Sequence, residues 1–418
     1  MYNLKLGKYI IVYIWITYLI YLLLPLQPLD FGLDETYTII FLIAVSIAIF
    51  WGCRTVKIIK HRDCIQSSHP FFNSTVLSVL QSIIIIITIL YIADLFASGL
   101  GGMTLAFGEN YEKMLKLSGK EIPVSLWGQM YAILSPLRYL ILSYGCYNFG
   151  NINKLNKILY LSLILVSMAY SVFGLGTQKG VGDIVIILVI TLWIKALRTR
   201  TIKKFKRNAL YITVLFIAFF SYMQSSRSEA LGYEGISAGK YKTYKEDNLI
   251  IDVFGKDVGV GLISFGSYVS NGYPGLNYCL QLPFVWTYGY GGSRAANDYF
   301  HRYLGLPSEF ENTYPLRMEK KVGWPGLMFW PTAFSWWASD LTWFGVVILM
   351  FLYTRVLCLM LKEAYYYNNP LSIATFSYLI IGIIYLPANN QLMQSTGNFI
   401  STVVLLIFWF ANHKKFNR

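Results

Sequence analysis

Long runs of apolar residues alternate with short polar connections over most of this chain. A transmembrane helix needs about 20 mostly apolar residues, because the hydrocarbon core of a bilayer is about 30 Å thick. Ten segments meet or nearly meet that requirement: Tyr9–Leu29, Thr36–Cys53, Ser74–Ser98, Val124–Phe149, Ile158–Gly174, Val181–Leu197, Ala209–Gln224, Asp340–Leu361, Leu371–Leu386 and Gly397–Ala411. The pattern predicts an all-α polytopic membrane protein with 10 to 12 transmembrane helices.

The long interval between the seventh and eighth segments interrupts this pattern. Its middle, residues 258–292, is apolar and aromatic but is broken by glycine and proline. It is expected either to dip into the outer leaflet as a hairpin or to add two spans, and the sequence leaves both open. The chain is therefore divided into an N-terminal bundle of seven helices (1–224), a large outward loop (225–339) and a C-terminal bundle of three helices (340–418).

Lys and Arg clusters set the orientation of the predicted spans. The clusters are Lys5/Lys8, Arg54/Lys57/Lys60/Arg62, Lys154/Lys157, six cations within 198–207, Lys362, and Lys414/Lys415/Arg418. All fall on one side of the predicted spans, which the positive-inside rule makes the cytoplasm. Both termini are then cytoplasmic, and the large loop faces outward.

Composition agrees with this topology, since 56% of residues are hydrophobic, 13% are charged and the mean hydropathy is +0.49. Much of the net charge of +14 belongs to the cytoplasmic clusters, so we do not interpret it as nucleic-acid binding. The five cysteines show no paired spacing, which argues against a disulfide framework or a zinc site. No cytoplasmic connection is long enough for a nucleotide-binding domain, so an enzyme here would use an activated group carried in the membrane, such as a polyprenyl pyrophosphate.

Three cations near the predicted spans are candidate pyrophosphate ligands. Lys179 lies in the glycine-rich turn Gly174–Asp183, where backbone N–H groups and a helix N-terminus favour anions; alternatively, it snorkels to water. Arg227 lies where the seventh span leaves the membrane and could clamp a phosphate or meet lipid headgroups. Arg138 lies inside the fourth span, where a charge costs about 2.5–3.5 kcal/mol and usually faces a cavity or a partner.

The large loop adds Arg294 and Arg317 as further glycan or pyrophosphate contacts. His301 is a candidate base, because histidine titrates near neutral pH, although a lone histidine is more often a surface residue. Asp340 is a second catalytic candidate, and as the residue that opens the eighth span it is also a candidate helix N-cap. Aromatic residues are dense here and could stack on sugars or form an interfacial belt: Tyr288, Tyr290, Trp324, Trp330, Trp336 and Trp337.

Four motifs resemble those of bacterial oligosaccharide repeat-unit polymerases, the O-antigen polymerase type. They are the residues 176–183 (GTQKGVGD), 267–276 with 283–292 (SYVSNGYPGL and PFVWTYGYGG), 336–345 (WWASDLTWFG) and 387–394 (PANNQLMQ). The resemblance covers the chain from about residue 90 to its end. It implies a GT-C-type architecture and a metal-independent glycosyltransferase that needs no cofactor.

The implied activity is transfer of a growing glycan from undecaprenyl pyrophosphate to the next lipid-linked repeat unit, on the periplasmic face. The resemblance further implies that Lys179, Arg227, Arg294 and Arg317 contact pyrophosphate or glycan and that His301 or Asp340 deprotonates or orients the acceptor. Membrane lipids and a chain-length regulator are the other expected partners. The alternatives are an O-antigen ligase, a flippase or transporter for lipid-linked sugars, and a metal-dependent enzyme that uses Asp30, Asp34 and Glu35.

Overall fold

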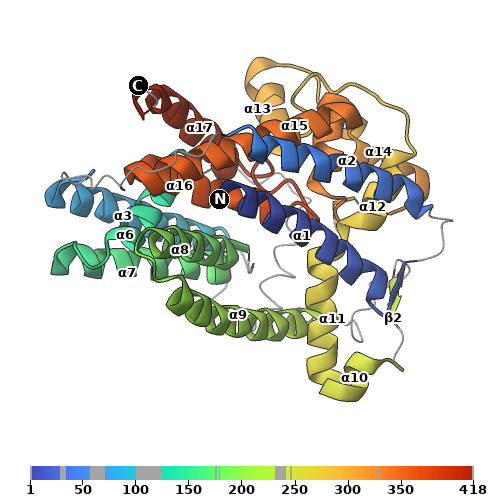
Figure 1. The fold of residues 1–418 in the computed structure, drawn as a ribbon, viewed down its shortest axis with the longest axis horizontal. Coiled ribbons are helices and arrows are strands. Elements are labelled where there is room, and N and C mark those ends of the chain that lie inside the picture. The colour runs from blue at the N-terminus through green and yellow to red at the C-terminus, as the bar shows by residue number, and fades with distance from the viewer. Residues whose placement is uncertain are drawn as a thin grey trace. The chain divides into compact units, whose positions relative to one another are not determined.

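The computed structural model describes residues 2–28, 34–56, 71–99, 125–174, 177, 179–230, 242–244, 247–324, 326–327 and 329–416. Helices dominate these residues (Figure 1). Six of the helices are long and apolar enough to cross a membrane: Lys5–Leu23, Glu35–Arg54, Ser74–Ala97, Lys154–Gly174, Lys179–Arg198 and Ala333–Tyr367. The chain is therefore a helical, multi-pass membrane protein, as its hydrophobic pattern predicts. The count of 10 to 12 spans and the GT-C-type resemblance stay predictions.

Contacts within the chain divide it into two compact units. The first unit contains residues 1–61, 236–362 and 381–399, and the second contains residues 62–235, 363–380 and 400–418. The sequence predicts a division into the consecutive parts 1–224, 225–339 and 340–418, whereas each compact unit combines segments that are separated in the sequence. The predicted division therefore stays a prediction.

The first unit combines the N-terminal helices with helices from the later part of the chain. They are α1 (Tyr2–Leu23), α2 (Glu35–Arg54), α10 (Leu249–Phe254), α11 (Lys256–Ser270), α12 (Gly272–Leu280), α13 (Arg294–Leu304), α14 (Tyr314–Val322) and most of α15 (Ala333–Tyr367). Two short strands, β1 (Leu26–Pro28) and β2 (Lys242–Tyr244), pair antiparallel. The apolar stretch 258–292 contains α12 and most of α11, and neither helix reaches the length of a candidate span.

The second unit is a helix bundle. It contains α3 (Ser74–Ala97), α5 (Leu126–Ile133), α6 (Ser135–Asn148), α7 (Lys154–Ala169), the π-helical turn η1 (Tyr170–Gly174), α8 (Lys179–Arg198), α9 (Ile202–Ala230), and most of α16 (Pro370–Ile384) and α17 (Thr396–Phe416). The predicted fourth span is broken at Leu134, because Pro136 opens α6 and cannot donate a helical hydrogen bond.

Helix α15 contains a second break, at Thr342. Its φ of 66° and ψ of 167° are not helical, and its hydroxyl accepts a hydrogen bond from the Gly345 amide at 3.2 Å. Thr342 therefore caps the C-terminal part of α15. Asp340 lies inside the preceding helical part, so the N-cap interpretation of Asp340 is wrong: the helix already begins at Ala333.

Candidate functional site

The first unit contains a tightly hydrogen-bonded turn around Asp340, which we call the Asp340 loop (residues 287–292). One carboxylate oxygen of Asp340 accepts hydrogen bonds from the Thr287 hydroxyl at 2.5 Å and the Gly289 amide at 3.1 Å. The other accepts from the Gly292 amide at 2.9 Å. Since three donors already occupy the carboxylate, Asp340 positions this loop and is poorly placed to take a proton from a substrate.

The backbone of the Asp340 loop explains why it is rich in glycine. Tyr288 and Gly289 adopt positive φ values of 56° and 85°, and the Thr287 carbonyl accepts from the amides of Tyr290 and Gly291. At Gly292, a Cβ atom would lie 2.5 Å from the Trp336 carbonyl oxygen and 2.7 Å from an Asp340 carboxylate oxygen. The loop can therefore approach α15 this closely only with glycine at position 292.

Side-chain hydrogen bonds to backbone carbonyls tie this loop and the residue after it to the segment between α16 and α17. The Asn390 side-chain amide donates to the Gly292 carbonyl at 3.1 Å, and the Ser293 hydroxyl donates to the Met393 carbonyl at 2.7 Å. Nearby, the Gly272 amide donates to the Pro387 carbonyl. The structure thus joins four of the quoted sequence segments, which are 267–276, 283–292, 336–345 and 387–394.

An exposed aromatic pair stands at the loop. The side chains of Trp286 and Tyr288 are 56% and 61% exposed, and their ring centroids lie 4.9 Å apart at 38°. Such rings present apolar faces that can stack on the C–H face of a sugar. Trp324, Trp336 and Tyr290 are instead buried in the core, so the stacking interpretation of these three residues is wrong.

Arg294 is the exposed cation beside this loop. It is the first residue of α13, and Ser293 caps that helix by accepting a hydrogen bond from the Ala296 amide at 3.1 Å. Its guanidinium lies 5.7 Å from the centroid of the Phe310 ring. The positive end of the α13 dipole and the Arg294 charge therefore coincide, which is a favourable arrangement for a phosphate oxygen.

Arg317, on α14, holds the backbone at Pro283, shortly before the Asp340 loop. One terminal nitrogen donates to the Pro283 carbonyl at 2.9 Å, and the guanidinium lies 5.5 Å from the centroid of the Tyr314 ring. Its other terminal nitrogen, Nη1, is buried and has no hydrogen-bond partner among the described residues. Arg317 therefore already has a structural contact, and its second terminal nitrogen is enclosed by the protein.

His301 lies on the last turn of α13, seven residues after Arg294 and so on nearly the same face of the helix. Its Nδ1 lies 2.8 Å from the Leu306 carbonyl oxygen. Because a carbonyl can only accept, Nδ1 carries the proton and Nε2 of the neutral ring keeps its lone pair. The ring is exposed, so Nε2 can act as a base.

Tyr290 connects His301 to the Asp340 loop. Its hydroxyl donates to the Pro307 carbonyl at 2.8 Å, next to the carbonyl that holds His301, and its ring meets Phe300 edge-on at 5.3 Å. Burial and the negative charge of Glu309 raise the pKa of Tyr290. The phenol therefore stays a hydrogen-bond donor at neutral pH.

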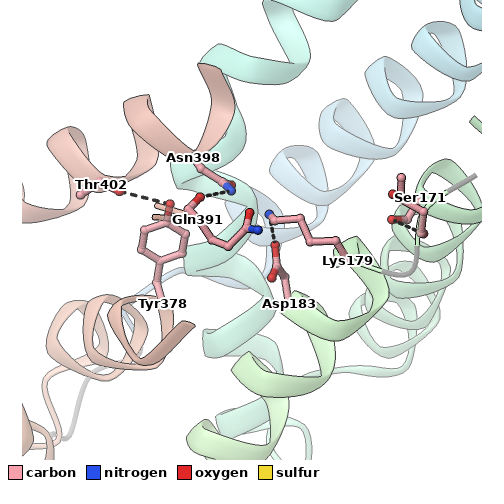
Figure 2. Close-up of polar contacts among 8 residues, drawn as sticks. Ser171, Lys179, Asp183, Tyr378, Gln391, Asn398 and Thr402 are labelled. Carbon is pink, nitrogen blue, oxygen red and sulfur yellow. Dashed lines mark hydrogen bonds and ion pairs between the residues drawn. The ribbon is translucent and has the colours of Figure 1, made fainter. Parts of the chain in front are cut away.

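Lys179, in the second unit, is paired with an acid. Its ammonium lies 2.7 Å from a carboxylate oxygen of Asp183, one turn along α8. The two side chains point toward each other in Figure 2. Asp183 is 3% exposed, and its other carboxylate oxygen is buried without a partner in the described part of the chain. Lys179 is therefore not an isolated point charge. Leu175, Gly176 and Gln178 of the predicted anion-binding turn lie outside the described residues.

Arg138 is buried among tyrosines. It is 7% exposed, and its guanidinium lies 4.2 Å from the centroid of the Tyr131 ring and 5.0 Å from that of Tyr139. Its Nη1 is buried and has no hydrogen-bond partner within the described ranges. Aromatic faces thus supply part of the stabilisation that the sequence led us to expect from a partner.

Two further groups of predicted residues are only partly described. Arg227 belongs to α9, but its side chain lies outside the described residues, as does Asp30. Asp34 caps α2 by accepting from the Thr36 amide at 2.9 Å, and hydrogen bonds from the Thr36 side chain and from this amide lower the pKa of Asp34. Glu35 accepts from the hydroxyls of Tyr18 and Tyr21 at 2.9 and 2.8 Å. The described part of this acidic turn therefore already has structural partners.

Sequence reasoning missed Thr287, Trp286 and Asp183. The Lys179–Asp183 pair could have been predicted, because residues four apart on a helix face each other. The donors to Asp340 come from a distant loop, so no sequence spacing predicts them.

The chain matches no family model, no curated protein and no solved structure in comparisons with known proteins.

Proposed function

We propose that this protein polymerises undecaprenyl-pyrophosphate-linked oligosaccharide repeat units into O-antigen or a related surface polysaccharide. The growing glycan is transferred to the non-reducing-end hydroxyl of the next lipid-linked unit on the periplasmic face. In this proposal the protein is a glycosyltransferase that requires no metal. An O-antigen ligase is the closest alternative, because it would use the same donor with another acceptor.

The observation that carries the proposal is the assembly around the Asp340 loop. Three motif segments that are far apart in the sequence meet there, namely 283–292, 336–345 and 387–394. An exposed aromatic pair, a helix-terminal arginine and a histidine lie in the same part of the first unit. A flat aromatic surface suits a sugar, and a helix N-terminus with arginine suits a phosphate. A glycan on a lipid pyrophosphate combines these two chemistries.

The proposed reaction is a displacement at the anomeric carbon of the donor sugar. The acceptor hydroxyl oxygen forms the new C–O bond while the bond from that carbon to the pyrophosphate oxygen breaks. The electron pair of the broken bond leaves on the pyrophosphate, where the positive charges of Arg294 and Arg317 would stabilise it. His301 Nε2 accepts the hydroxyl proton, and Asp340 holds the loop that contains Tyr288 and directly follows Trp286.

The cations of the second unit have separately proposed roles. Lys179 and Arg227 are proposed to contact the pyrophosphate or the glycan, as the resemblance implies. Arg138 is proposed as a further contact because a charge inside a span usually faces a cavity or a partner. Membrane lipids and a chain-length regulator are the other proposed partners, with no nucleic acid involved. A transporter for lipid-linked sugars remains an alternative, and the buried Arg138 is the feature that favours it.

The test is reconstitution of the purified protein with lipid-linked repeat units from its own host. A gel ladder of longer glycans that survives excess chelator supports the proposal. Transfer of glycan only to a different lipid acceptor would favour the ligase, and movement of the lipid-linked units across the bilayer without elongation would favour the transporter.

Two exposed arginines on α13 provide a matched comparison in the same assay. Arg294→Ala removes the helix-terminal cation, and we expect elongation to fall about 10²–10³-fold, the effect typical of losing one group that stabilises developing charge. Arg302→Ala removes an exposed cation from the same helix and should leave elongation within about threefold of the parent rate. Equal losses in both variants would refute a specific role for Arg294.

A further inference from the structure

The first two turns of α9, in the second unit, carry four cations and no acid. The cations are Lys203, Lys204, Lys206 and Arg207, and all four side chains are exposed. Within the described part of the chain, none of the four forms an ion pair. Their charges are therefore open to an anion from outside the chain.

The cations that precede them, on α8, are used by the protein itself. Lys195 donates to the Tyr147 carbonyl at 2.5 Å. Arg198 donates to the carbonyls of Ala364 and Tyr365. Both also lie in the last turn of α8, where the helix dipole favours a cation. The cations of α9 lie at the start of a helix, where the dipole disfavours them, so the chain itself does not explain their position.

Three of the α9 cations continue into exposed apolar residues on the same helix face. Positions 203, 206, 207, 210, 211 and 214 follow the i, i+3, i+4, i+7, i+8, i+11 spacing of one face. Ile202, Phe205 and Ala209 lie on another face and are half-buried, and α9 packs against α8 (Figure 1). We call the exposed face the α9 strip: Lys203, Lys206, Arg207, Leu210, Tyr211 and Val214.

The apolar half of the α9 strip is suited to acyl chains. Leu210, Tyr211 and Val214 are each more than half exposed, and they belong to the seventh predicted span, residues 209–224. A helix rises 1.5 Å per residue, so Arg207 and Lys203 lie about 5 Å and about 10 Å beyond Leu210 along the axis. The headgroup region of a bilayer is about 5–8 Å deep on each side of the hydrocarbon core. The cations therefore lie at the height of lipid phosphates when the apolar half meets the acyl chains.

Charge selects the class of lipid. A cluster of cations beside a membrane-spanning helix favours headgroups with a net negative charge over zwitterionic headgroups. From Lys203 to Arg207 the cations extend over about 6 Å along the axis, which suits two phosphates better than one. The positive-inside rule assigns this end of α9 to the cytoplasmic leaflet.

We propose that the α9 strip binds an anionic phospholipid of the cytoplasmic leaflet and prefers a lipid with two phosphates, such as cardiolipin. The phosphates contact Lys203, Lys206 and Arg207, and an acyl chain packs along Leu210 and Val214. This gives a site to the membrane-lipid partner named above, and it does not depend on glycan transfer.

The experiment is native mass spectrometry of the full chain in a non-ionic detergent, titrated with phospholipids of matched acyl chains. We expect cardiolipin to bind more tightly than phosphatidylglycerol and at least about tenfold more tightly than phosphatidylcholine. Inorganic pyrophosphate and a short single-stranded DNA supply negative charge without acyl chains. They should bind at least about tenfold more weakly than cardiolipin, because they cannot cover the apolar half of the strip.

Two variants test the face and not merely the charge. Lys206→Gln should weaken cardiolipin binding about fivefold, the effect of one cation near a lipid surface. Lys206→Asn combined with Asn208→Lys keeps the net charge but moves the cation about 200° around the helix, and the same loss is expected. Lys154→Gln removes an exposed cation from the first turn of α7 and should leave the affinity within about twofold of the parent value.

The proposal is overturned if phosphatidylcholine, pyrophosphate or DNA binds as tightly as cardiolipin. It is also overturned if the charge-conserving double variant keeps the parent affinity, or if Lys154→Gln loses as much as Lys206→Gln. Because only lipid binding is measured, failure here is distinct from failure of the glycan-elongation assay.

Discussion

Replacement of Asp340 by asparagine tests whether this carboxylate holds the Asp340 loop in place. The parent side chain accepts one hydroxyl and two amide hydrogen bonds. Asparagine can keep one oxygen for Thr287 and Gly289, but its NH₂ group then faces the Gly292 amide, which is also a donor. The variant therefore loses one charge-assisted hydrogen bond and weakens two others.

The size of the effect follows from these contacts. A hydrogen bond to a charged group contributes about 1.5–3 kcal/mol, so we expect the loop to be destabilised by about 2–4 kcal/mol. At about 1.4 kcal/mol for each factor of ten, its amides should exchange about 30- to 1,000-fold faster with deuterium. Thr287→Val removes a single bond to the same oxygen and should show a smaller increase.

Hydrogen–deuterium exchange with mass spectrometry of the peptide that contains residues 287–292 provides the measurement. Asp298→Asn serves as the control, because Asp298 is an exposed acid on the neighbouring helix α13. Unchanged exchange in Asp340→Asn, or an equal change in Asp298→Asn, would refute the positioning role. Glycan elongation should fall together with loop order, since Trp286 and Tyr288 depend on it.

Three further predictions test other parts of the structure. Gly292→Ala places a Cβ against the Trp336 carbonyl and should lower the stability by about 1–3 kcal/mol, measured as a lower thermal midpoint; an unchanged midpoint would contradict the close approach. Trp286→Ala should weaken glycan elongation about tenfold through loss of stacking, whereas Phe344→Ala, which removes another exposed ring, should not change the rate. Arg138→Met should keep or raise the thermal midpoint, because it removes a buried charge, yet reduce elongation; full activity would argue against ligand binding at Arg138.

The order of apolar and basic segments by itself determined that this is a helical, multi-pass membrane protein. The reason is local: about 20 consecutive apolar residues can satisfy their backbone in a bilayer only as a helix. The break at Pro136 and the Lys179–Asp183 pair also depend only on neighbours within a turn or two.

Only the tertiary structure decided which candidate residues are available to a ligand. Trp324 and Trp336 resemble Trp286 in the sequence, but packing buries the first two and leaves the third exposed. Asp340 could have been a helix cap or a base, and the donors that occupy it come from a loop about fifty residues earlier. Such contacts join segments with no shared periodicity, so no local pattern encodes them and the folded chain alone specifies them.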